Sequence, residues 1–263
     1  MNFNRIKNRL SFVLVMIGVG WSALSYSPQT FEAPPPGGNE SAAELIAQAD
    51  KLYAEREDLT RLRSGITALR RALTLEPGNY DAAWRLAKFN YYLGAHTKDE
   101  SERDRAFRDG AAGGKRAVEL QANKPEGHFW LGANYGGSAQ HSTLAGLTSV
   151  DNIIEEMETV LKLDEGYQSG SAYMVLGQVY LTAPKMLGGD KQKAVEMLEK
   201  GLRFGENNAF LRLRLAEAYS AVNRNDEARK QLEALSNIKP SADYLPEYKE
   251  AMAEAEKLRA KIS

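Results

Sequence analysis

Apolar residues recur every three or four positions from residue 41 onward, and no segment alternates strictly between apolar and polar residues. This spacing is typical of amphipathic helices and argues against half-exposed strands. A short motif of Leu, a small residue, two spacers and Tyr occurs at residues 131–135, 176–180 and 215–219, with a weaker copy at 86–91. A second apolar stretch follows each copy, with small or apolar residues at positions i, i+4 and i+7. The chain is therefore predicted to consist of repeated helix pairs.

The small residue of each motif, at Gly132, Gly177 or Ala216, lets the second helix approach the first closely. This pattern resembles the tetratricopeptide repeat (TPR) family over about residues 42–240. The resemblance implies an all-α, tetratricopeptide-like helical-hairpin solenoid. Residues 244–262 are expected to form a final helix that caps its end.

Three consecutive repeats carry extra residues at the turn between their two helices. The step from the Tyr position to the second helix is 9 residues in the last repeat, from Tyr219 to Ala228. The corresponding steps are 20, 18 and 14 residues in the three preceding repeats. We therefore expect long intra-repeat loops along one edge of the solenoid, where insertions often serve binding.

A narrower resemblance rests on several local stretches within the repeats. These are residues 125–132, 146–147, 153–158, 183–184, 187–190 and 193–194. In this combination the chain is similar to the T component associated with tripartite ATP-independent periplasmic (TRAP) transporters. The resemblance implies a periplasmic, non-enzymatic homo-oligomer that presents ligand-holding cavities to a substrate-binding protein. The lipid anchor typical of that family is not expected, because the chain has no Cys.

In TPR proteins the first helices line the groove. The residues two positions before each motif Leu are large and apolar. Of those four positions further on, three are polar: Lys88, Gln178 and Glu217. The predicted groove residues are Trp84, Lys88, Phe129, Met174, Gln178 and Leu213. One interpretation is a groove for a hydrophobic ligand or an amphipathic partner segment. The other is that the same residues are ordinary core, covered by a tight superhelix or by the C-terminal helix.

Polar residues in the insert from 136 to 149 suggest a rim over this groove. Gln140 and His141 are the candidate rim residues. The alternative interpretation is a solvated loop with one histidine.

The N-terminus has the features of an export signal. Arg5, Lys7 and Arg9 precede an apolar run at residues 10–24. Residues 1–25 are therefore predicted to be a signal peptide or an N-terminal membrane anchor. The Pro- and Gly-rich residues 26–40 are predicted to be a linker, followed by the TPR-like domain at 41–263. The expected location is the periplasm or the cell envelope.

Composition excludes several kinds of function. Lys and Arg total 34 against 35 acids among 263 residues, so no nucleic-acid-binding charge is present. The absence of Cys excludes thiol catalysis, and His96, His128 and His141 lack the spacing of metal ligands. We expect no catalytic residues, no metal site and no cofactor. The sequence predicts an exported binding protein, accessory to solute uptake, that holds a hydrophobic small ligand or a partner protein. The alternative is a cell-envelope assembly scaffold without a small ligand.

Overall fold

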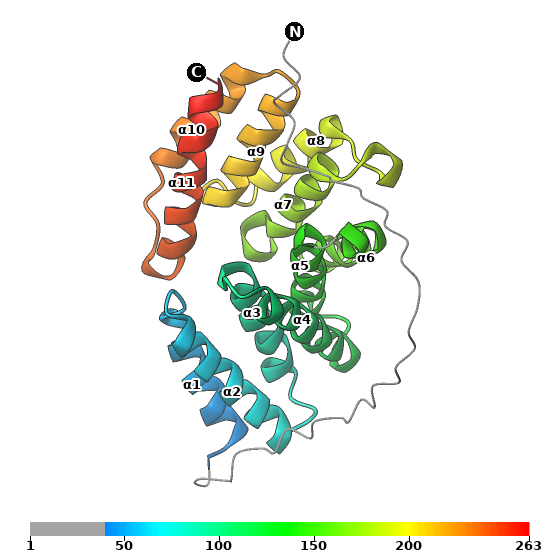
Figure 1. Ribbon diagram of the computed structural model, residues 1–263, viewed down its shortest axis with the longest axis vertical. Helices are drawn as coiled ribbons and strands as arrows, with labels where there is room; N and C mark the ends of the chain where they lie inside the picture. Colours follow the sequence, from blue (N-terminus) through cyan, green and yellow to red (C-terminus); the bar gives the residue numbers. More distant parts are fainter. Residues whose placement is uncertain (1–39, 142, 263) are drawn as a thin grey trace, which may run out of the picture. The chain divides into compact units, whose positions relative to one another are not determined.

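The computed structural model describes residues 40–141 and 143–262, apart from the side chains of 143–148. This part of the chain forms helices only, without a strand (Figure 1). The helices are α1 (Ala42–Ala54), α2 (Leu59–Leu75), α3 (Tyr80–His96), α4 (Glu100–Leu120), α5 (Pro125–His141), α6 (Thr143–Leu163), α7 (Tyr167–Thr182), α8 (Lys191–Leu202), α9 (Ala209–Ala221), α10 (Asn225–Ser236) and α11 (Leu245–Ile262). Short 3-10 turns at Lys185–Leu187 and Ala242–Tyr244 precede α8 and α11.

Successive helices pair as antiparallel hairpins, from α1 with α2 to α9 with α10, and neighbouring hairpins contact one another. The predicted all-α, tetratricopeptide-like fold is confirmed. Polar side chains fix where many helices begin. The Asp190 carboxylate, for example, accepts hydrogen bonds from the Gln192 and Lys193 amides at 2.9 and 3.1 Å, so Asp190 is the predicted N-cap of α8.

Helices approach closely at small residues, both within a pair and between neighbouring pairs. A Cβ on Gly177 of α7 would lie 2.4 Å from Leu198 Cγ of α8. A Cβ on Gly114 of α4 would lie 2.8 Å from the backbone nitrogen of Leu131 in α5. Both distances are too short for a side chain, so glycine is required for these crossings. The predicted role of the small residues is therefore confirmed.

Two hydrophobic clusters hold most of the core. One joins α1 and α2 to α3, with Leu62, Leu69 and Phe89 fully buried. The other runs from α3 through α5 to α11 and includes Met157, Leu198 and many other buried residues. The stack is therefore held by contacts between neighbours, as in other repeat proteins.

The inserts differ in part from expectation. In the first two of the three repeats the extra residues lengthen helices: α3 and α4 are separated only by residues 97–99, and α5 ends at His141, next to α6. Only residues 183–190 form a longer connection. The cause is local packing, since Phe107 of α4 is buried against Gly94 and Gly137, which leave room for its ring. The prediction of long intra-repeat loops is therefore wrong for those two inserts.

Helix α11 is bonded to both ends of the repeat array. Its apolar residues Ala251 and Ala255 are fully buried, and the helix packs on α9 and α10. Near its start, Glu247 accepts hydrogen bonds from Arg56 Nε and Nη2 at 3.0 and 2.6 Å. Glu250 lies 2.6 Å from His96 Nε2, at the end of α3. The final helix therefore caps the last repeat and also contacts the first.

The predicted signal peptide and nearly all of the predicted linker lie outside the described residues. Glu40, the last linker position, forms an ion pair with Arg71 at 2.8 Å. Within the described ranges, no helix has both the length and the apolar character needed to cross a membrane.

Replacing Arg56 by alanine is expected to destabilise the fold. The Arg56 side chain is only 4% exposed, and its removal leaves Glu247 and the Asp243 carbonyl without their donor. We expect the free energy of unfolding, measured by urea denaturation, to fall by about 2 kcal/mol. Lys249→Ala breaks an exposed 3.5 Å ion pair with Glu57 at the same junction and should cost less than about 0.5 kcal/mol. Equal effects of the two variants would contradict a structural role for the Arg56 pair.

Candidate functional site

The predicted groove residues lie on the first helices of successive repeats, and we call their surface the groove face. Leu213 is fully buried and Phe129 is 5% exposed, whereas Trp84 and Met174 are half-buried. All four apolar members belong to the hydrophobic cluster that runs to α11. The groove face therefore has a buried apolar floor and a partly accessible remainder.

Two polar members of the groove face are half-buried. The Lys88 ammonium lies 4.1 Å from the centre of the Tyr53 ring. The side-chain oxygen of Gln178 is buried and has no hydrogen-bond partner in the described part of the protein. Unpaired buried polar atoms are uncommon in folded proteins and often mark functional positions.

Sequence reasoning missed Trp130, although it follows Phe129 directly. Its ring lies 5.7 Å from Tyr91 of α3 and 5.0 Å from Phe129. Phe129 in turn lies 5.3 Å from Tyr167 at the start of α7. A continuous row of aromatic rings therefore joins three first helices beneath the groove face. These contacts join residues far apart in the sequence, so only the structure shows them.

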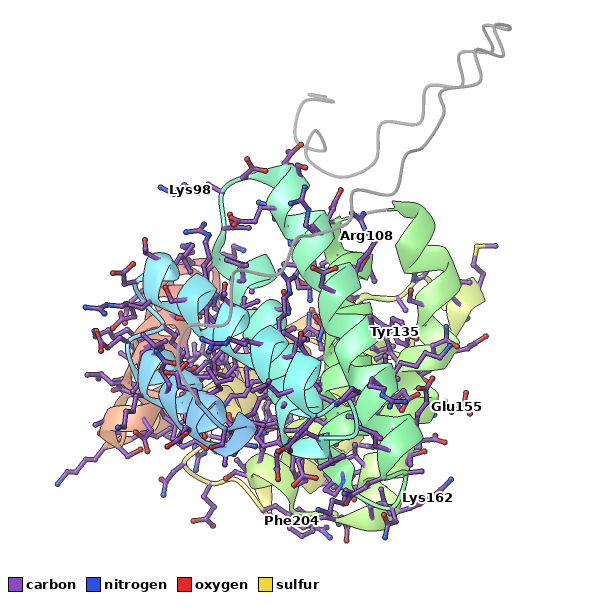
Figure 2. All side chains as sticks on the ribbon, turned by 90° about the horizontal axis from the view of Figure 1, so that it is seen from below. Lys98, Arg108, Tyr135, Glu155, Lys162 and Phe204 are labelled. Carbon is purple, nitrogen blue, oxygen red and sulfur yellow. The ribbon has the colours of Figure 1, made fainter. Side chains whose placement is uncertain are left out.

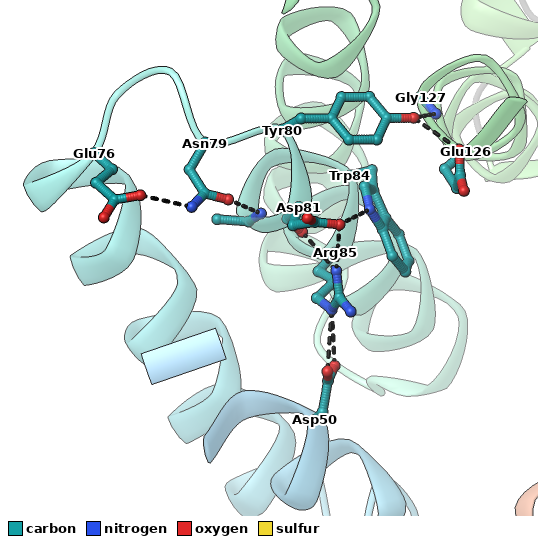
Figure 3. Close-up of polar contacts among 10 residues, drawn as sticks. Asp50, Glu76, Asn79, Tyr80, Asp81, Trp84, Arg85, Glu126 and Gly127 are labelled. Atoms are coloured by element: carbon teal, nitrogen blue, oxygen red, sulfur yellow. Dashed lines mark hydrogen bonds and ion pairs between the residues drawn. The ribbon is translucent and has the colours of Figure 1, made fainter. Parts of the chain in front are cut away.

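The start of α3 holds the Trp84 indole in place (Figure 3). The Asp81 carboxylate accepts hydrogen bonds from Trp84 Nε1 at 3.1 Å and from Arg85 Nη1 at 3.0 Å. Arg85 also donates to Asp50 of α1 at 3.0 Å and lies over the Trp84 ring at 4.3 Å. The orientation of Trp84 is thus fixed by charged groups from two repeats.

The candidate rim residues Gln140 and His141 are exposed at the end of α5. The His141 ring stacks on Phe107 with centres 6.0 Å apart, and burial together with nearby Arg103 lowers its pKa. Within the insert from 136 to 149, the side chains of residues 142–148 lie outside the described set. Figure 2 shows Arg108 and Tyr135, from α4 and α5, among the labelled side chains on the surface.

His128 and His96 each use both ring nitrogens. His128 Nδ1 lies 2.6 Å from Glu156 Oε2, and its Nε2 lies 2.9 Å from the Ala122 carbonyl oxygen. His96 contacts the Tyr92 carbonyl and Glu250 in the same way, at 2.7 and 2.6 Å. Two acceptors require two N–H donors, so both rings are placed as imidazolium ions that join helices. Neither ring has a free nitrogen to act as a base in this arrangement.

Metal binding finds no support at these positions. Among the described residues, no group of three or more His, Asp or Glu side chains is arranged to hold a metal ion.

Helix pairs that cross at small residues, stacked with their first helices in register, define a TPR-type helical-repeat fold. The sequence profile of the TRAP transporter T-component family matches residues 43–261. The chain therefore belongs to that family, as its sequence pattern suggested. No curated protein matches the chain by sequence.

Two solved structures show the same fold. One is TTC0263, a thermophilic TPR protein of Thermus thermophilus, with 22% identity and a TM-score of 0.59 over 81% of this chain and 100% of that one. The other is PilF of Pseudomonas aeruginosa, with 16% identity and a TM-score of 0.53 over 81% and 90% of the two chains. At these identities the similarity concerns the fold alone.

The His128–Glu156 pair should make stability depend on pH. The hydrogen bond to Glu156 outweighs burial and raises the pKa of His128 above its usual value. The stabilisation is therefore fully present below about pH 6.5 and is lost as the pH rises through the raised pKa. We expect Glu156→Gln to lower the His128 pKa measured by NMR titration. The variant should also remove part of the wild-type decline in urea midpoint between pH 6 and pH 8.5. An unchanged His128 pKa in the variant would show that Glu156 does not hold the imidazolium.

Proposed function

We propose that this chain is an exported, non-enzymatic binding protein that holds a hydrophobic small ligand or a partner protein segment on its groove face. In this role it is accessory to solute uptake. The observation that carries the proposal is that Trp84 and Lys88 of α3, and Met174 and Gln178 of α7, are all half-buried at equivalent positions of first helices. A face that combines large apolar groups with a few polar groups suits a ligand or an amphipathic helix.

Membership in the T-component family supports the accessory role and the proposed partner. The partner that fits is a periplasmic substrate-binding protein, and a homo-oligomer is compatible with the same role. The location would be the periplasm or the cell envelope, with the chain exported through residues 1–25 or anchored through residues 10–24. The basic and apolar pattern of that segment supports this part of the proposal.

A second candidate is a cell-envelope assembly scaffold without a small ligand. The full burial of Leu213 and the 5% exposure of Phe129 favour it, because the floor of the groove face is already covered by the chain itself. In that case the accessible part of the face would contact only protein.

Native mass spectrometry of the protein purified from its host tests the proposal and separates the two candidates. A small bound mass supports the ligand carrier, and a bound protein supports the scaffold. We expect Trp84→Ala to lower the affinity for the bound species by about 10-fold or more, since large aromatic side chains dominate binding energy. The substitution should lower the free energy of unfolding by only about 1 kcal/mol, because Trp84 is only half-buried.

Two control variants test stability and binding separately. Leu213→Ala removes a fully buried side chain and should lower the free energy of unfolding by about 2–5 kcal/mol. Phe204→Ala removes an aromatic ring that is 42% exposed and lies outside the groove face, and it should leave binding unchanged. A Trp84→Ala protein that loses stability but keeps its bound species would assign Trp84 to the core and contradict the proposed binding face.

A further inference from the structure

One repeat lacks the Tyr of the motif. In three repeats the motif Leu is followed four positions later by a Tyr, at 135, 180 and 219. In the repeat formed by α3 and α4, Asn90 holds that position. The Asn90 side chain is 1% exposed and donates a hydrogen bond to the Leu86 carbonyl oxygen at 2.8 Å. A smaller side chain therefore occupies a buried position that holds an aromatic ring in the other three repeats.

The last repeat shows what the Tyr does at this position. The Tyr219 hydroxyl donates to Glu199 of α8 at 2.7 Å, and the Arg224 guanidinium before α10 lies 4.4 Å from the ring centre. Tyr180 similarly has the Lys193 ammonium of α8 at 4.0 Å from its ring centre. The Tyr219 ring thus lies between two successive second helices, with a carboxylate at its hydroxyl and a cation on its face.

A cavity of about 230 Å³ lies next to Asn90. Ile66 of α2 and Ala106 of α4 line it together with Asn90, and all three side chains are buried. The cavity therefore lies between two successive second helices, as the Tyr219 ring does. Asn90 comes two residues after Lys88, so the cavity is on the other side of α3 from the groove face.

Two ion pairs join the second helices across this cavity. Arg63 of α2 binds Glu102 of α4 through two hydrogen bonds, at 2.7 and 2.8 Å. Arg70 of α2 binds Asp109 of α4 at 2.6 Å. The two pairs are seven residues apart on each helix, so they connect α2 and α4 at two levels. The space between them is therefore part of the folded structure and does not depend on a ligand to form.

Two polar groups that line the cavity have unused hydrogen-bonding atoms. Arg105 lies near Glu102 but forms no hydrogen bond or ion pair with a described residue. The side-chain oxygen of Asn90 accepts no hydrogen bond from a described residue. The cavity thus offers a cation for the face of a ring and an acceptor for a hydroxyl group.

We infer that this cavity binds a phenol group from outside the chain. The group takes the place of the motif Tyr, with its ring against Arg105 and its hydroxyl donating to Asn90. The volume is below the roughly 300–1,000 Å³ of sites for drug-sized ligands, so the space suits a single ring. This site is separate from the groove face and goes beyond the proposed function. The phenol comes either from a small free molecule or from a Tyr side chain of a partner protein.

NMR titration of the full chain with p-cresol tests this inference, because p-cresol reproduces the Tyr side chain. We expect p-cresol to shift the side-chain amide signals of Asn90 and to bind with a Kd of about 1 mM or tighter. Toluene lacks the hydroxyl group and should bind about 3-fold more weakly or worse, since it cannot donate to Asn90. No binding of p-cresol at about 10 mM, or binding that leaves the Asn90 signals unchanged, would refute the site.

Asn90→Tyr restores the motif and should fill the cavity with the chain's own ring. We expect this variant to weaken p-cresol binding by at least about 10-fold and to raise Tm by about 2–4 °C, as cavity filling does in domains of this size. Arg105→Ala should weaken binding about 3-fold, since it removes the cation from the face of the ring. Arg108→Ala, at an exposed arginine of α4 labelled in Figure 2, should leave binding unchanged.

The variants decide whether the phenol occupies this cavity. If Asn90→Tyr keeps the wild-type affinity for p-cresol, the phenol binds elsewhere and the inference is refuted. If Asn90→Tyr does not fold, Arg105→Ala and Arg108→Ala decide, and equal affinities of these two variants refute the inference.

N-acetyl-tyrosinamide identifies the source of the phenol. Binding as tight as that of p-cresol supports a Tyr side chain of a partner protein. Binding of p-cresol alone supports a small free phenol.

Discussion

The close approach of neighbouring helices is the constraint on which the rest of this structure depends. At Gly177 and Gly114 even a methyl group would collide with the neighbouring helix. These crossings bring the first helices of successive repeats into one row, and the buried aromatic rings from Tyr91 to Tyr167 bridge that row. The groove face is a consequence of this packing, because equivalent positions of each motif then lie side by side.

Charge distribution then gives the groove face its chemical character. The pairs Arg56–Glu247 and Arg85–Asp50 tie α1 and its following turn to α11 and α3. Arg85 also binds Asp81 of its own helix, which accepts a hydrogen bond from the Trp84 indole. Structural ion pairs thus fix the orientation of a side chain on the groove face.

Much of the fold could be predicted from the sequence, because the repeat motif indicates which residues contact one another across each helix pair. The first two inserts could not, since their helical form depends on Phe107 packing into space left by Gly94 and Gly137. The bond from Arg56 to Glu247 joins residues 191 positions apart, and no local pattern indicates it. For the candidate site, the motif spacing predicted residues that lie on the first helices of successive repeats. Their burial, and the missing partner of the Gln178 side-chain oxygen, depend on the folded surroundings.

The claim that the groove face is the binding surface is tested most directly by site-specific photo-crosslinking in the host cell. A benzophenone amino acid would replace Trp84 on the groove face and, in a second protein, Phe204 outside it. The account predicts a discrete crosslinked adduct from position 84 and none of the same mass from position 204. Identical adducts from both positions, or an adduct from position 204 alone, would contradict it.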